Sequence, residues 1–230
     1  MNKNKIKTVL IILTTIVICL SVGVYAGYTL SATDVNYTKS DGSTVSVKAA
    51  LDELNTKVPT KSIGDEVTVG GEQFYVLDWN NDSDTVNLIA KYVLNSDATA
   101  QSSSAVTCAF SSTSYWSSSF TSDPFNLNDF IGFTSTDALG KAKSYGRSKG
   151  AVSSRLLSYE EADALKTKSS SNSKIQSMLI NGQSYWLGSA SYPGYVLYVH
   201  KNGNLVDHGN SNTMYAGVRP VITVLKSSIS

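Results

Sequence analysis

The first thirty residues carry an apolar pattern that follows a short basic start. Three lysines fall within the first seven residues, and no charged residue follows until Asp34. The run from Thr8 to Ala26 has about 19 residues and would span roughly 28 Å as a helix, close to the ~30 Å core of a bilayer. We predict an export segment in residues 1–30, either kept as a transmembrane anchor or cleaved after Ala26. Because basic flanks resist translocation, the rest of the chain is expected outside the membrane.

Residues 31–62 have a different pattern, which we interpret as a short stalk. An extended piece around Tyr37 precedes a turn signal at residues 40–42, and apolar residues then recur at helical spacing within residues 45–58. A helix of this length is marginal by itself, so its apolar stripe needs a partner. The stripe either packs on its own domain or drives self-association beside the membrane.

From residue 63 the pattern changes to the alternation of apolar and polar residues that is typical of β-strands. Residues 63–94 contain three such runs, with turn signals at Gly70-Gly71 and at residues 80–84, and they predict a three-stranded meander. Residues 95–122 are rich in serine and predict a long, partly irregular loop.

The middle of the chain is predicted to be helical. Residues 138–148 fit a short helix, and a second helix is expected over residues 158–168. Ser158 stands three positions before Glu161, which is the signature of a capping box. Residues 155–157, just before this cap, predict a short strand or a hydrophobic staple.

The last fifty residues show the clearest strand pattern. Asn202-Gly203 stands between two apolar-rich runs, and this dipeptide favours a two-residue type I′ hairpin turn. With that turn, Tyr198 lies opposite Asp207. Directly opposed residues share a face, so both are predicted on the outer face with His200, while the alternate residues point inward.

Composition and charge describe the surface more than the partner. The chain has 19 Lys and Arg against 18 Asp and Glu, and without the N-terminal lysines the balance is about −2. This balance gives no indication of a nucleic-acid partner. With 16% charged residues and 13 tyrosines, the surface is of the polar, aromatic-rich kind common in exported binding modules. Only Cys108 lies beyond the export segment, so no intrachain disulfide is expected there.

Four stretches resemble a domain of unknown function that recurs in exported proteins of Gram-positive gut bacteria. They are GDEVTVGGEQFYVLD, RLLSYEEADAL, YWLGS and GVRPV. That family is similar to the C-type-lectin fold, which formylglycine-generating enzymes and hypervariable receptors also use. The resemblance implies an α+β, C-type-lectin-like domain at residues 63–230, with small antiparallel sheets, two or so helices and a ligand surface formed by loops near the C-terminal strands.

The sequence departs from that family at two positions and from true C-type lectins in its motifs. Gly188 and Ala190 stand where an Arg and a Pro are expected after the Trp-Leu pair. The calcium and sugar signatures Glu-Pro-Asn and Trp-Asn-Asp are absent from the sequence. Calcium-dependent sugar binding is therefore not implied.

Catalysis and metal binding find little support in the residue patterns. Nucleophilic catalysis needs a base beside an activated Ser or Cys, and the two histidines, His200 and His208, are expected on opposite faces of the hairpin. Residues 78–84 have the alternating spacing of a calcium loop but lack its glycine and its distal glutamate, so a polar turn is the better interpretation. We predict neither an enzyme nor a bound metal or cofactor.

Residues predicted to contact a ligand lie between residues 191 and 215, where aromatic and amide side chains are dense. Tyrosine gives a large contact area at low entropy cost, and amides give adaptable hydrogen bonds. The candidates are Tyr192, Tyr195, Tyr198, His200, Asn202, Asp207, His208, Asn210, Asn212 and Tyr215. The alternative is an ordinary polar loop and a solvated hairpin face.

Two further residues, Trp186 and Arg219, are predicted to be structural. Arg219 has apolar neighbours in the sequence, and a buried charge must be paired or hydrogen-bonded. It is expected to bind nearby backbone or a carboxylate, for which the candidates are Glu160, Glu161 and Asp163.

The patterns together predict a cell-surface binding module. It is expected to sit in the cell membrane through residues 8–30, with its C-terminal domain outside, and to recognise an extracellular protein or glycan through its C-terminal loops. One alternative is an envelope component that forms homo-oligomers through residues 45–58, and a weaker one is an envelope-acting hydrolase. Secretion after cleavage of the signal is the alternative location.

Overall fold

The structure is a computed structural model that describes residues 35–50, 60–112, 124–129 and 133–230, without the side chains of Asp207, His208 and Asn210. The chain divides into two compact units, Met1–Pro59 and Thr60–Ser230. Among the described helices, none combines the length and the apolar character needed to cross a bilayer. The predicted export segment at residues 1–30 lies outside the described residues.

The described part of the first unit is a β-hairpin followed by the start of a helix. Strands β1 (Asn36–Thr38) and β2 (Thr44–Ser46) pair antiparallel. Gly42, with a φ of +86°, donates its N–H to the Lys39 carbonyl at 2.9 Å, which confirms the predicted turn. Helical backbone begins at Val47, and residues 51–58 of the predicted apolar stripe lie outside the described residues.

A five-stranded antiparallel sheet forms the centre of the second unit. Its order is β3-β4-β5-β13-β9. The strands are β3 (Glu66–Val69), β4 (Glu72–Val76), β5 (Thr85–Ala90), β13 (Pro220–Leu225) and β9 (Ser153–Leu156). The first three confirm the predicted meander, and Gly70 and Gly71 both have the positive φ that a type I′ turn needs. Pro220 is the first residue of β13, where a strand tolerates proline.

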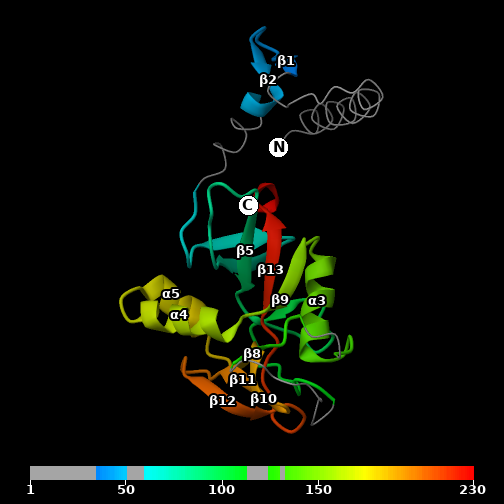
Figure 1. Cartoon of the computed structure of the whole chain (residues 1–230), viewed down its shortest axis with the longest axis vertical. Coiled ribbons are helices and arrows are strands. Elements are labelled where there is room, and N and C mark those ends of the chain that lie inside the picture. The colour runs from blue at the N-terminus through cyan, green and yellow to red at the C-terminus, as the bar shows by residue number, and fades with distance from the viewer. Residues whose placement is uncertain (1–34, 51–59, 113–123, 130–132) are drawn as a thin grey trace. The chain divides into compact units, whose positions relative to one another are not determined.

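A second, four-stranded antiparallel sheet has the order β12-β11-β10-β8. Its strands are β8 (Phe125–Asn126), β10 (Tyr185–Tyr192), β11 (Tyr195–Val199) and β12 (Leu205–Asn210). A short pair is formed by β6 (Val93–Leu94) and β7 (Gln101–Ser102). Figure 1 shows the four-stranded sheet at the end of the unit that lies away from the C-terminus.

Within the described residues of the second unit, three α-helices pack on the strands. They are α3 (Ala138–Ser148), α4 (Tyr159–Ser169) and α5 (Ser173–Leu179), and a 3-10 turn spans Lys226–Ser228. Helices α3 and α4 were predicted, and the Ser158–Glu161 capping box is formed. Helix α5 was not predicted; it has only seven residues, and its start signal is Asn172, whose side chain accepts the N–H groups of Lys174 and Ile175.

The strands separate two apolar cores. Helix α3 contributes to the first core, which contains Phe74, Tyr145, Trp186 and Ile222, and α4 and α5 contribute to the second. Figure 1 shows α3 on one side of β9 and β13, with α4 and α5 on the other side. Alternate residues of β11 enter different cores, Val196 and Tyr198 the first, and Leu197 and Val199 the second. Strands covered on both faces account for the near-continuous apolar runs in the sequence.

The structure is therefore a mixed α and β fold with small antiparallel sheets and few helices. This confirms the α+β class that the sequence predicted. The C-terminal residue of the second unit pairs with the first strand, because Thr68 of β3 and Ser230 exchange backbone hydrogen bonds of 2.9 and 3.1 Å. This pairing covers part of the edge of β3, which would otherwise present unpaired backbone groups.

Gly188 explains the first departure from the expected Trp-Leu motif. The Asn128 side chain lies against it, accepting the N–H of Leu156 at 2.9 Å and donating to the carbonyl of the same residue at 3.1 Å. A Cβ on residue 188 would come within 2.2 Å of the Asn128 amide nitrogen. The absence of a side chain at this position thus lets one buried amide join β9 to β10.

Replacing Gly188 by Ala is expected to lower the free energy of unfolding by about 1–3 kcal/mol, because the added methyl displaces the Asn128 amide. Urea unfolding measures this cost. In an Asn128→Ala background the same replacement should be at least about 1 kcal/mol less destabilising, since the two residues are in contact. Equal costs in both backgrounds would contradict the proposed contact.

A polar network anchors α3 to β4. The Glu72 carboxylate accepts the Tyr145 hydroxyl at 2.5 Å, the Lys149 ammonium at 2.7 Å and the Gln101 N–H at 3.1 Å. Burial by itself would raise the pKa of Glu72, but the hydrogen bonds from Lys149 and Tyr145 outweigh it and lower this pKa. Burial, followed by the bond to Glu72, raises the pKa of Tyr145. The network is therefore most stable with Glu72 ionised and Tyr145 protonated.

The lowered pKa of Glu72 predicts a stability contribution that is present above the pKa of the unfolded chain and is lost as the pH falls through the folded-state pKa. At pH 6, Glu72→Gln should reduce the free energy of unfolding by about 1–2 kcal/mol, and the difference from the unaltered chain should shrink toward pH 3. Urea unfolding at several pH values tests this.

The matched control is Glu66→Gln, which removes a more exposed partner of Lys91. A surface pair of this kind contributes less than about 1 kcal/mol. A difference between Glu72→Gln and the unaltered chain that stays constant from pH 6 to pH 3 would show that the carboxylate charge does not stabilise the fold.

Candidate functional site

Two tyrosines stand at the tip of the β10–β11 hairpin. Tyr192 pairs with Tyr195 across a two-residue turn of Pro193 and Gly194, and Gly194 has a φ of +87°. The two rings are 4.9 Å apart between centroids and inclined by 49°. Tyr192 is 54% exposed and Tyr195 is half-buried. The hairpin tip thus presents an aromatic pair to solvent.

The segment that follows β12 is tied to this tip. Ser211 is fully buried, and its N–H donates to the Gly194 carbonyl at 2.9 Å. The Ser211 carbonyl in turn accepts the N–H of Ser111 at 3.1 Å. At the other end of the segment, Tyr215 is 61% exposed and directly precedes Ala216, which forms a β-bridge with Cys108. Backbone contacts therefore fix both ends of the loop that carries Asn212 and Tyr215.

Trp186 supports this part of the sheet from inside. Its ring is fully buried and makes edge contacts with Phe110 at 5.6 Å and Tyr198 at 5.9 Å. Its indole N–H donates to the Cys108 carbonyl at 2.9 Å, so the one polar atom of the side chain is satisfied. Gly209 of β12 lies against the same ring, since a Cβ there would come within 2.8 Å of it. The location agrees with a structural role for Trp186.

The predicted register of the β11–β12 hairpin is wrong by one residue. Tyr198 pairs with Val206 rather than with Asp207. The loop has three residues, because the His200 carbonyl accepts the Gly203 N–H at 2.7 Å and only Gly203 has a positive φ. This is a type I turn followed by a left-handed glycine, which adds one residue to the expected type I′ turn.

The predicted outer position of Tyr198 is also wrong. Its ring is 9% exposed and packs on Trp186, because both faces of β11 are covered. Burial raises the pKa of its hydroxyl. We therefore assign Tyr198 to the core beneath the surface and leave it out of the candidate contact residues.

The structure separates the remaining candidates into two groups. Tyr192 ends β10 and Tyr195 begins β11, where Tyr195 pairs with Asn210. His200 and Asn202 lie at its end, so the five residues of β11 place them about 16 Å away. The two groups do not form one continuous contact site, and the aromatic group is the candidate that we retain. Asp207, His208 and Asn210 belong to β12, and their side chains lie outside the described residues.

Within the distal group, the polar atoms bond to each other. His200 Nδ1 lies 2.8 Å from Asn202 Oδ1, and this same oxygen accepts the Asn204 N–H at 3.1 Å. These contacts order the three-residue loop. Among the hydrogen bonds described for His200, none joins it to a serine or cysteine side chain, the arrangement that nucleophilic catalysis requires.

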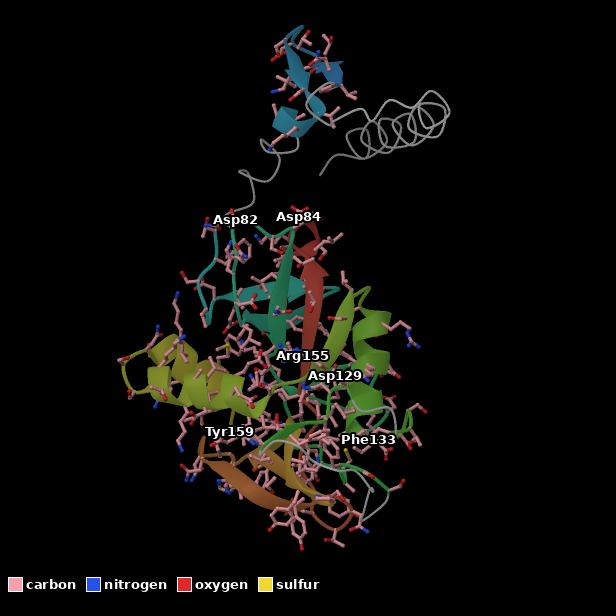
Figure 2. All side chains as sticks on the ribbon, viewed as in Figure 1. Asp82, Asp84, Asp129, Phe133, Arg155 and Tyr159 are labelled. Atoms are coloured by element: carbon pink, nitrogen blue, oxygen red, sulfur yellow. The ribbon has the colours of Figure 1, made fainter. Side chains whose placement is uncertain are left out.

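The acidic segment at residues 78–84 forms a turn at the other end of the unit. Figure 2 shows Asp82 and Asp84 far from Tyr159 and β12. Asn80 Oδ1 accepts the Asp82 N–H at 2.9 Å, and the Asp78 carboxylate accepts the Asn87 amide at 2.6 Å. Across the part of the chain that the structure describes, no three His, Cys, Asp or Glu side chains gather to hold a metal ion.

One of the predicted carboxylate partners of Arg219, Glu161, binds another arginine. Arg155 engages Glu161 through two bonds of 2.6 Å, and Figure 2 shows Arg155 near the start of α4. Arg219 is fully buried, and its Nε donates to the Ala90 carbonyl at 2.7 Å. Of the two alternatives, backbone hydrogen bonding is thus observed, and an ion pair with Glu161 is not.

Comparison with known proteins adds no assignment: no family model, no curated protein and no solved structure matches this chain. The resemblance to the C-type-lectin fold therefore stays a prediction.

Sequence reasoning missed the residues that hold the aromatic tip in place. The Pro193-Gly194 dipeptide is a recognisable turn signal and places Tyr192 opposite Tyr195. No local sequence pattern predicts the contacts of Ser211 with Gly194 and Ser111, because they join segments that are far apart in the chain.

Proposed function

We propose that this chain is a membrane-anchored extracellular binding module that recognises a protein or glycan through the loops next to its C-terminal strands. The contact surface is the aromatic tip, defined as Tyr192, Tyr195 and Tyr215. Residues 8–30 anchor the chain, and the domain beyond residue 62 is displayed outside. The observation that carries the proposal is the Tyr192–Tyr195 pair on an ordered hairpin, in which Tyr192 is exposed and Tyr195 is half-buried.

Exposure separates Tyr192 and Tyr215 from the other described aromatic residues. In the described part of the chain, Tyr192 and Tyr215 are two of only four large hydrophobic side chains that count as exposed, with Val152 and Leu225. A tyrosine ring offers a large apolar contact area with few rotatable bonds, together with a hydroxyl that can donate or accept. Such side chains are enriched among the residues that dominate binding energy.

Ordering of the tip strengthens the proposal. The β10–β11 turn is closed by strand pairing, and the Gly194 carbonyl is held by Ser211. Trp186 fills the space beneath the sheet. A surface that is already ordered loses less conformational entropy when a ligand binds. The aromatic tip thus combines exposure with rigid support.

We include in the proposal that the domain has a C-type-lectin-like fold. A C-type-lectin-like domain would present its ligand surface on loops near its last strands, and the aromatic tip lies on the loops around β10, β11 and β12. Two small antiparallel sheets with few helices agree with that class. Fold alone does not define function, so the proposal depends on the tip.

Changing Tyr192 and Tyr195 together to Ala is expected to weaken attachment to the ligand at least about tenfold, because two central aromatic contacts are removed. The full chain is screened against a panel of immobilised glycans and extracellular proteins, and the dissociation constant is measured for each partner that binds.

Two control variants make this test specific. Val152→Ala removes a 67% exposed apolar side chain that lies outside the tip. His200→Ala alters the distal end of β11. Both should bind as the unaltered chain does. Unchanged affinity of the tyrosine variant would refute the site, and failure of the unaltered chain to bind any partner would refute the function.

An envelope component that self-associates through residues 45–58 is the second candidate. The observation that favours it is the helix that starts at Val47, directly after β2. Light scattering should then find oligomers of the exported part, residues 31–230, and monomers once residues 31–62 are removed. Monomers in both cases would eliminate this candidate.

A further inference from the structure

Backbone hydrogen bonds join three segments of the described chain at the aromatic tip. The Gly194 carbonyl accepts the Ser211 N–H at 2.9 Å, and the Ser211 carbonyl accepts the Ser111 N–H at 3.1 Å. Cys108 and Ala216 exchange backbone hydrogen bonds of 2.9 and 3.1 Å. The three segments therefore lie side by side. We call them together the tip surface, and they are residues 107–112, 191–195 and 211–216.

The tip surface has an uncharged composition. None of its three segments contains Asp, Glu, Lys, Arg or His. Its exposed and half-buried side chains instead carry aromatic rings, hydroxyl groups, an amide and a thioether. They include Thr107, Ser112, Tyr192, Tyr195, Asn212, Thr213, Met214 and Tyr215. The side chains that reach solvent here can thus stack and form hydrogen bonds, but they cannot form an ion pair.

Two charged residues border the tip surface from the side of α3. The buried Asp137 carboxylate accepts the Ser112 N–H at 3.0 Å, and it also accepts the N–H and the hydroxyl of Thr134 at 2.7 and 2.9 Å. Burial raises the pKa of the Cys108 thiol, and the nearby Lys141 ammonium acts against that rise. Because this thiol packs against the first core, Lys141 borders the tip surface on its inner side.

An uncharged surface of this kind suits a ligand that is itself uncharged and rich in hydroxyl groups. A charged ligand would lose hydration on contact without meeting an opposite charge. Protein partners commonly contribute arginine and complementary charges, which find no counterpart on these three segments. We propose that the tip surface binds a neutral glycan. This inference rests on the binding function proposed above and names the class of ligand.

The aromatic rings narrow the choice of sugar. Tyr192 and Tyr215 are 54% and 61% exposed, so their rings are available for stacking. β-Linked glucose and N-acetylglucosamine carry every ring substituent in the equatorial position, which leaves only C–H groups on the two faces of the sugar. The negative face of a tyrosine ring attracts such C–H groups. Hydroxyl and amide side chains nearby can donate to or accept from the sugar hydroxyls. The expected ligand is therefore a chain of these sugars.

Titration calorimetry on the full chain, in a polyoxyethylene detergent that contains no sugar, tests the ligand class. The probes are hexasaccharides of β-linked glucose, of β-linked N-acetylglucosamine and of galacturonic acid, the last of which carries carboxylates. At least one of the two neutral probes should bind, and the acidic probe should not. The dissociation constant should change less than about twofold between about 0.05 and about 0.5 M sodium chloride, because no charged contact is screened.

Two outcomes of this titration would overturn the inference. The first is binding of the acidic probe, or affinity that falls steeply with salt. The second is a chain that binds an extracellular protein through the aromatic tip but neither neutral probe, a result that would leave the proposed function intact. Failure to bind any glycan or protein would refute the proposed function itself.

Variants of the exposed Tyr215 test the stacking contact. Tyr215→Ala should weaken binding of the neutral hexasaccharide at least about tenfold, because the ring is lost. Tyr215→Phe keeps the ring and should stay within about threefold of the unaltered chain, since it removes only a hydroxyl at the surface. Val152→Ala, outside the tip surface, should have no effect. Unchanged affinity in Tyr215→Ala, or an equal loss in Tyr215→Phe, would overturn the stacking on which the choice of sugar depends.

Discussion

The indole of Trp186 lies where three separate segments of the chain meet. Its ring packs on Phe110 and Tyr198, its N–H bonds to the Cys108 carbonyl, and the backbone of Gly209 approaches its edge. Burying so large a ring removes more apolar surface from water than most other side chains of the fold, and it requires all three segments to be in place. This side chain, together with the backbone bonds of Cys108 to Ala216 and of Ser111 to Ser211, thus fixes the C-terminal sheet against the loop at residues 108–111.

The same packing determines which aromatic side chains are exposed at the surface. Since both faces of β11 are covered, its side chains stabilise the fold. In the described part of the chain, the exposed aromatic side chains, Tyr192 and Tyr215, lie where strands turn or end. Tyr192 and Tyr195 are therefore at a hairpin tip and not on a sheet face. Their support from Ser211 and Gly194 makes the tip an ordered feature. A binding module of this kind would recognise its ligand through few residues on a rigid base, with the loop that ends at Tyr215 as its neighbour.

Arg219 and the Glu72 network illustrate two ways in which this fold treats buried polar groups. Glu72 is surrounded by Tyr145, Lys149 and Gln101, which together satisfy it and join α3 to the sheet. Arg219 has one backbone partner and one aromatic neighbour, and its remaining donors face the interior. The first arrangement is a closed structural network. The second arrangement relies on a backbone carbonyl and on the face of an aromatic ring.

Much of the local structure followed from the sequence alone. The meander at residues 63–94, the helix at residues 138–148 and the capping box at Ser158 were predictable, because hydrophobic periodicity and start signals involve residues that are close in the chain. The same local logic predicted a turn at Asn202-Gly203, although not its length. Whether a glycine takes part in a two-residue or a three-residue loop depends on how the strands pair. That pairing involves residues outside the loop itself.

Tertiary structure decided which strand faces are covered and which charged side chains pair, and hydrophobic periodicity shows neither. A strand pattern shows which residues alternate, but it does not show whether the second face is open to water or covered by another element. For Tyr198 this difference turned an expected ligand contact into a core residue. It also decided that Glu161 binds Arg155 while Arg219 bonds to the Ala90 carbonyl, because the partner of a charged side chain is set by packing and distance in space. The sequence determined the elements and their chemistry, and the fold determined which of these groups reach the surface.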